Sequence, residues 1–129
     1  MTRIEEEVEL LRTAYPALDH KFEGGQHWIL LPKQPLPPGW SVAEAEISFI
    51  IPAQAGQQPY AFFTRPALVL AGGGTPSNYI NPAATPWGGD FGQFSWAPLG
   101  PWVPKADIRA GANMLNFVRS FADRLTEAS

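Results

Sequence analysis

The chain has 129 residues, with 9 Lys and Arg against 12 Asp and Glu and a net charge of −3. This length is typical of one domain, and a hydrophobic content of 45% with 12% aromatic residues argues against intrinsic disorder. The cationic residues are scattered, which argues against a basic footprint for nucleic acid. The absence of cysteine excludes disulfides, thiolate nucleophiles and cysteine metal clusters.

The start of the chain is acidic, whereas a signal or transit peptide is basic or apolar at this place. No apolar run reaches the ~18 residues that a membrane span requires. We therefore expect a cytoplasmic protein that has no membrane segment.

A short helix is predicted over residues 2–13. Thr2 is a favourable N-cap, acidic residues follow it in the first turn, and the apolar residues of one helical face are Ile4, Val8 and Leu11. The Tyr15-Pro16 pair ends the helix, because the residue before a proline is pushed out of helical space.

Four glutamates lie close together in this helix, at Glu5, Glu6, Glu7 and Glu9. We interpret them as a solvated helix face that the helix dipole favours. Docking onto a basic partner is the alternative interpretation.

Strand-like runs follow the helix. Residues 21–23 and 27–31 flank the Gly24-Gly25 turn and predict a β-hairpin. Residues 44–51 alternate polar and apolar side chains, which is the period of a strand with one wet face. An antiparallel meander of about four strands is completed by two more apolar runs, at 60–63 and 67–70.

Residues 72–101 show no helical period and are punctuated by glycine and proline. So long an irregular stretch in a small domain is typical of a functional segment. Packing rather than disorder is indicated by its aromatic residues, which are Tyr79, Trp87, Phe91, Phe94 and Trp96.

A second helix is predicted after Pro104, with Asp107 as its cap. Its apolar face comprises Ile108, Gly111, Leu115, Val118, Ala122 and Leu125, widened by Met114, Phe117 and Phe121. Its solvent face comprises Arg109, Asn116, Arg119 and Asp123. The order helix, strands, irregular segment, helix predicts an α+β fold in a single domain, residues 1–129.

This order resembles the ubiquitin-conjugating (UBC-like) superfamily, and four matches carry the resemblance in chain order. They are His27-Trp28 at the start of a strand, residues 47–52 followed by Pro59-Tyr60, the stretch Gly92–Trp96, and Trp102-Val103-Pro104 before the last helix. Seven positions separate Ser95 from Trp102, close to the family spacing between nucleophile and tryptophan.

The resemblance to bacterial UBC-like proteins of ubiquitin-like conjugation implies a transferase. It implies that Ser95, standing where the family has cysteine, accepts the C-terminus of a ubiquitin-like modifier as an oxyester and passes it to an amine of a protein substrate. An adenylating activating enzyme is the implied source of the modifier. Three features depart from the family: its His-Pro-Asn triplet and its last two helices are absent, and the first helix is acidic rather than basic.

A serine nucleophile requires a positioned base and an oxyanion donor. We name Asp90 and Asp107 as candidate bases or orienting groups, and Asn81 or Asn78 as the candidate amide donor. Three alternatives stay open: a catalytically inactive UBC-like scaffold that binds a modifier or activating enzyme, an unrelated loop serine, and an engineered replacement of cysteine.

His20 and His27 are the two histidines of the chain, and both lie far in sequence from the irregular segment. We interpret them as strand-edge or hydrogen-bonded residues rather than bases. Because they show no metal-ligand spacing with the carboxylates, no metal and no cofactor is expected.

Overall fold

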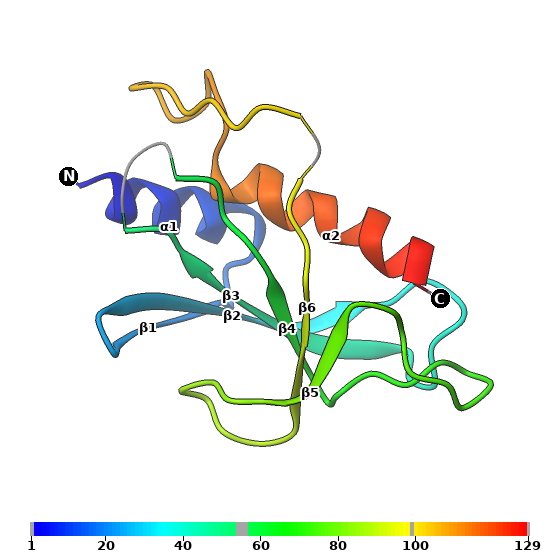
Figure 1. The fold of residues 1–129 in the computed structure, drawn as a ribbon. Coiled ribbons are helices and arrows are strands. Elements are labelled where there is room, and N and C mark those ends of the chain that lie inside the picture. The colour runs from blue at the N-terminus through cyan, green and yellow to red at the C-terminus, as the bar shows by residue number, and fades with distance from the viewer. Residues whose placement is uncertain (1, 54–56, 99, 129) are drawn as a thin grey trace.

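The computed structural model of the chain describes residues 2–53, 57–98 and 100–128. In chain order the elements are α1 (Arg3–Ala14), β1 (Asp19–Glu23), β2 (Gln26–Pro35), β3 (Glu44–Ile51), β4 (Phe62–Arg65), β5 (Tyr79–Ala83), β6 (Phe91–Phe94) and α2 (Met114–Ala128). The strands form one antiparallel sheet in the order β1-β2-β3-β4-β6-β5. Both helices lie on the same face of this sheet (Figure 1). The α+β prediction is therefore confirmed.

The first helix forms as its sequence predicts. The Thr2 side chain accepts a hydrogen bond from the Glu5 N–H, and the Glu5 carboxylate accepts one from the Thr2 N–H, which completes a capping box. At the other end, the N–H of Tyr15 donates to the Leu11 carbonyl. No helix in the described part of the chain is long and apolar enough to cross a membrane.

The predicted hairpin and the strand at 44–51 are confirmed as β1, β2 and β3. The run at 60–63 contributes only its last two residues to β4, and the run at 67–70 forms no strand. Its one ladder contact is the isolated bridge between Leu70 and Trp40.

The irregular segment contains two strands that the sequence did not predict. Its β6 pairs with β4, and β5 pairs with β6 at the edge of the sheet, so the sheet has six strands rather than about four. The prolines obscured β5, yet an edge strand tolerates Pro82, because an edge position does not require every backbone N–H for pairing.

The second helix begins at Met114, six residues later than predicted. Asp107 caps a turn instead, since its carboxylate accepts from the N–H of Arg109. The helix start is fixed by Asn113 and Asn116, each of which accepts a backbone N–H bond from the other through its side-chain oxygen. Ala122, predicted on the apolar face, is exposed.

The helix-covered side, here called the inner face, contains the main core. Its buried residues include the aromatic rings of Phe49, Phe62, Phe94, Phe117 and Phe121. A smaller cluster lies on the other side, the outer face, and comprises Trp28, Leu30, Phe63 and Phe91. Trp87, from the loop between β5 and β6, packs against this cluster on the side away from the helices (Figure 1).

Candidate functional site

A cavity of about 370 Å³ lies where the start of α1, the end of β3, the segment 102–106 and the start of α2 meet. Its apolar lining includes Ile4, Ile51, Pro52, Trp102 and Met114, and its charged lining is Arg3, Glu6, Glu7 and Lys105. The volume falls within the range of ligand sites, and an apolar lining with a few charged groups is their usual composition.

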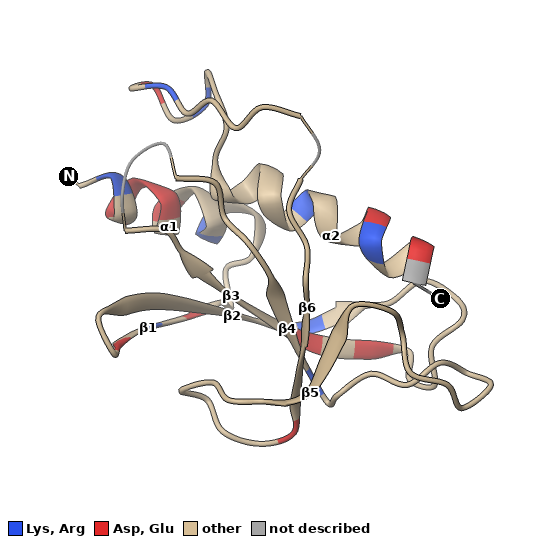
Figure 2. Ribbon diagram, viewed as in Figure 1, with Lys and Arg blue, Asp and Glu red and all other residues tan. Residues whose placement is uncertain are grey.

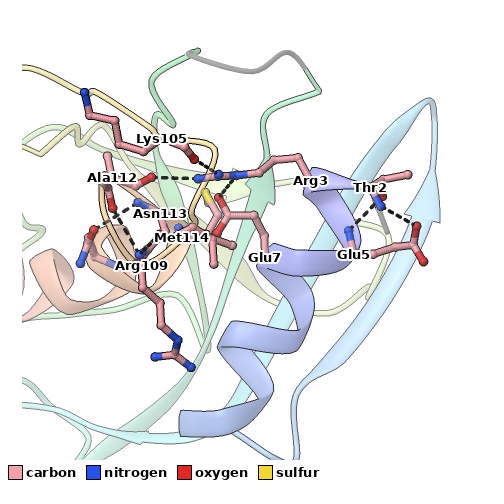
Figure 3. A network of polar contacts seen from close by, with 12 residues as sticks. Thr2, Arg3, Glu5, Glu7, Lys105, Arg109, Ala112, Asn113 and Met114 are labelled. Atoms are coloured by element: carbon pink, nitrogen blue, oxygen red, sulfur yellow. Dashed lines mark hydrogen bonds and ion pairs between the residues drawn. The ribbon is translucent and has the colours of Figure 1, made fainter.

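Glu7 joins the two helices at the wall of this cavity. Its side chain is buried, one carboxylate oxygen accepts the N–H of Met114 at 3.0 Å, and the other lies 3.5 Å from Arg3 Nε (Figure 3). Burial raises the pKa of Glu7, although the Met114 bond and Arg3 oppose this shift. Because it accepts the Met114 N–H, the Glu7 carboxylate lies at the N-terminus of α2, where the helix dipole favours negative charge.

Arg3, one helical turn before Glu7, joins α1 to the segment that leads to α2. Its guanidinium donates to the carbonyl of Lys105 at 2.6 Å and to that of Ala112 at 3.1 Å (Figure 3). Gly111 allows this segment to fold back tightly, because a Cβ there would lie 2.6 Å from the Val103 carbonyl. The hydrogen bonds and ion pair of Arg3 and Glu7 thus connect the segments that line the cavity, and both side chains already have protein partners.

A second cavity, of about 240 Å³, adjoins the first along α1 and shares Glu6 with it. It is lined by Glu6, Glu9, Leu10, Thr13, Ile108 and Arg109. We call the two cavities together the α1 groove. Figure 2 shows acidic residues on α1 and cationic residues on the loop that leads to α2. The groove therefore offers apolar contact next to three carboxylates, Glu6, Glu7 and Glu9, and three cations, Arg3, Lys105 and Arg109.

The prediction of a solvated acidic face is wrong for Glu7, which is 5% exposed. The signal was present in the spacing, since Glu7 lies three residues after Ile4 and four before Leu11, on the apolar stripe. The neighbouring Glu5 and Glu9 are exposed, as predicted.

Ser95 lies directly after β6 and is half-buried. Its N–H donates to the Asn78 carbonyl at 3.0 Å. Strand alternation places its side chain on the outer face with that of Gln93, away from α2. Within the residues that the structure describes, the Ser95 hydroxyl makes no hydrogen bond.

The structure does not gather Asp90, Asn81 and Asp107 around Ser95, and Asn78 contacts Ser95 through its backbone carbonyl. Asp90 precedes β6 and Ser95 follows it, which separates them by about 16 Å along an extended strand. Asn81 is an exposed residue of the edge strand β5, and Asp107 is bonded in the turn before α2. Neither Ser95 nor Asp90, Asn81 or Asp107 lines the α1 groove. Because β5 pairs with β6, much of this segment is extended strand, and Asn81, Asp90 and Ser95 lie apart along it.

Among the described residues, no group of three or more His, Asp or Glu side chains is placed to hold a metal ion. Comparison of the chain with protein-family models, with curated proteins and with solved structures found no match.

Proposed function

We propose that the chain is a UBC-like binding module that holds a protein partner through the α1 groove and does no covalent chemistry itself. The observation that carries the proposal is an apolar cavity bordered by carboxylates of α1, of which Glu6 is half-buried and Glu9 is exposed. The proposed partner has a basic segment, and the UBC-like resemblance suggests that it is the adenylating activating enzyme of a ubiquitin-like modifier.

The chemistry of the groove favours a lysine or arginine side chain. The long stem of such a residue is apolar and suits Ile4, Trp102 and Leu10, while its charged end reaches Glu6 or Glu9. Opposite charges on two surfaces also raise the rate of association and fix the relative orientation. Three cations also line the groove. Arg3 is already bonded to two carbonyls and lies close to Glu7, whereas Lys105 and Arg109 oppose the attraction.

The test is binding of an adenylating activating enzyme of the ubiquitin-like conjugation class, measured by calorimetry at two salt concentrations. In Glu6→Gln/Glu9→Gln we expect affinity to fall by about ten-fold, and the salt dependence to weaken with it. Glu44→Gln removes an exposed carboxylate at the start of β3 and is the matched control, with wild-type affinity expected. Wild-type binding by the double variant would contradict the proposal.

A second candidate function is the acyl transfer suggested by the resemblance. It is favoured by the half-buried Ser95 hydroxyl, which makes no hydrogen bond to the residues that the structure describes. The hydroxyl oxygen would attack the carbonyl of the adenylated modifier, the bond from the acyl carbon to the phosphate oxygen would break to release AMP, and the hydroxyl proton would pass to water or to the partner. An amine would then displace Ser95 and restore its hydroxyl.

This second function is tested with activating enzyme, modifier and ATP, followed by mass spectrometry. It requires a hydroxylamine-sensitive adduct that Ser95→Ala abolishes and Ser41→Ala retains, Ser41 being exposed on another loop. Binding without any adduct would leave the binding module as the function.

A further inference from the structure

The two histidines meet across the β1–β2 hairpin, near the edge of the sheet. The register pairs Phe22 with His27 and His20 with Ile29, so the histidine side chains project from the same face on adjacent strands. His20 Nε2 lies 2.9 Å from His27 Nδ1, and the ring centroids are 5.1 Å apart. The two histidines are seven positions apart in the sequence, which is not a typical metal-ligand spacing. The hairpin brings them together.

The protonation state of this pair leaves it able to bind a cation. A hydrogen bond between two imidazole nitrogens requires a donor and an acceptor, which two neutral rings provide. Neutral imidazole nitrogens are also the groups that ligate metals, so the contact brings two potential ligand atoms together.

The spacing of the two nitrogens matches that of two ligands on one ion. Imidazole nitrogens bind at about 2.0–2.1 Å, so two of them at a right angle on one metal are about 2.9 Å apart. We propose that His20 and His27 form a bidentate site for a divalent transition metal of the Cu²⁺ class, with water in the remaining positions. Imidazole ligands and square geometry suit Cu²⁺, and the affinity order places Zn²⁺ below it.

Binding needs only local rearrangement. The hydrogen in the contact moves, through solvent, to the other nitrogen of its own ring, and small side-chain rotations turn both lone pairs toward the ion, so no net proton is released. His20 is exposed, which permits the rotation, while the Phe22 ring lies 4.6 Å from that of His27 and supports it.

The charged neighbours set a limit on affinity. Arg12 of α1 donates to the Leu18 carbonyl at 3.4 Å and is the cation near His20. Asp19, Lys21 and Glu23 point to the opposite face of β1. Two protein ligands fall short of the four that close a structural site, so the ion keeps open positions.

The test is titration of the tag-free chain with Cu²⁺ and with Zn²⁺ at neutral pH, followed by calorimetry and by the histidine ring resonances. We expect one equivalent of Cu²⁺ to bind, both rings to respond together, and Zn²⁺ to bind more weakly. His20→Gln and His27→Gln are each expected to lower the affinity by about ten-fold or more, and the double variant by little further, because one ion needs both rings. Glu23→Gln, an exposed carboxylate on the opposite side of β1, is the control.

Circular dichroism of each variant checks that the hairpin and the rest of the fold are retained. The proposal is wrong if the single variants keep wild-type affinity. It is equally wrong if two independent equivalents bind, or if the loss of affinity in Glu23→Gln matches that in the histidine variants.

Discussion

The two faces of the sheet are covered and stabilised in different ways. On the inner face the helices bury large apolar side chains, and the rings of Phe62 and Phe121 stack with centroids 4.1 Å apart. On the outer face no helix of the described residues covers the sheet, and the loop from β5 to β6 covers a smaller apolar cluster.

Directional polar contacts fasten that loop. The Arg65 guanidinium binds both carboxylate oxygens of Glu46, at 2.7 and 2.8 Å, and donates to the Gly88 carbonyl at 2.7 Å. The Trp87 indole N–H donates to Ser48 Oγ at 2.9 Å. The inner face thus depends on buried area and the outer face on a few bonds, so we expect the outer face to open at lower free energy.

The largest effect is expected for Phe117→Ala on the inner face. Phe117 is fully buried against Phe49 and Phe121, and its truncation leaves a cavity that costs about 3–5 kcal/mol of unfolding free energy. Denaturant unfolding measures this loss. Phe22→Ala, with a side chain 63% exposed, is the matched control and is expected to change stability little.

Glu7 is expected to give the next largest effect. Glu7→Leu leaves the buried N–H of Met114 without its acceptor, which costs about 1–3 kcal/mol. Glu7→Gln retains an acceptor oxygen and is expected to cost less. A loss as large in the glutamine variant would show that the charge, rather than the hydrogen bond, joins the helices.

The pH dependence of the unfolding free energy distinguishes the charge of Glu7 from its hydrogen bond to Met114. Because the pKa of Glu7 is raised above its ordinary value of 4.5, the folded chain binds this proton more tightly than the unfolded chain. The unfolding free energy therefore falls as pH rises from 4.5 through the folded pKa. Glu7→Gln is expected to remove this fall, as measured by unfolding at a series of pH values.

On the outer face, Trp87→Phe keeps an aromatic ring and removes the bond to Ser48. We expect the free energy of unfolding to fall by about 0.5–1.5 kcal/mol. We also expect faster amide exchange, confined to the loop between β5 and β6 and to the residues of β3 and β4 that this loop covers. Uniformly faster exchange across the inner face would contradict the difference between the two faces.

The smallest effect is expected for Glu46→Gln. The two side chains of this ion pair are 33% and 27% exposed, so solvent screens them and the loss is about 0.2–1 kcal/mol, smaller at high salt. Arg65 lowers the pKa of Glu46 below 4.5. Its contribution is therefore complete above pH 4.5 and is lost as pH falls through the folded pKa. Unfolding of the variant and the wild type at pH 7 and at acid pH measures both effects.

Local patterns predicted the first half of the fold correctly. The cap at Thr2, the Gly24-Gly25 turn and the alternation in 44–51 act over a few residues, and each element formed where its signal lay. Strands β5 and β6 carry weak local signals and form because β4 offers a free edge for pairing. The start of α2 was missed because Asn113 and Asn116 cap it, and because Glu7, distant in sequence, accepts its first N–H.

The candidate site was predicted less well than the fold. Ser95 was selected from a short match, whereas cavities depend on which distant segments meet, as α1 meets residues 102–106. The contact between His20 and His27 likewise depends on the hairpin register rather than on spacing.

Both borders of the sheet discourage further strand addition. Pro82 interrupts the row of donors along β5, and β1 presents alternating charges at Asp19, Lys21 and Glu23. Growth into fibrils or swapped oligomers through these borders is thereby disfavoured. We therefore expect a partner of this protein to approach a helix or a loop rather than to add a strand to the sheet.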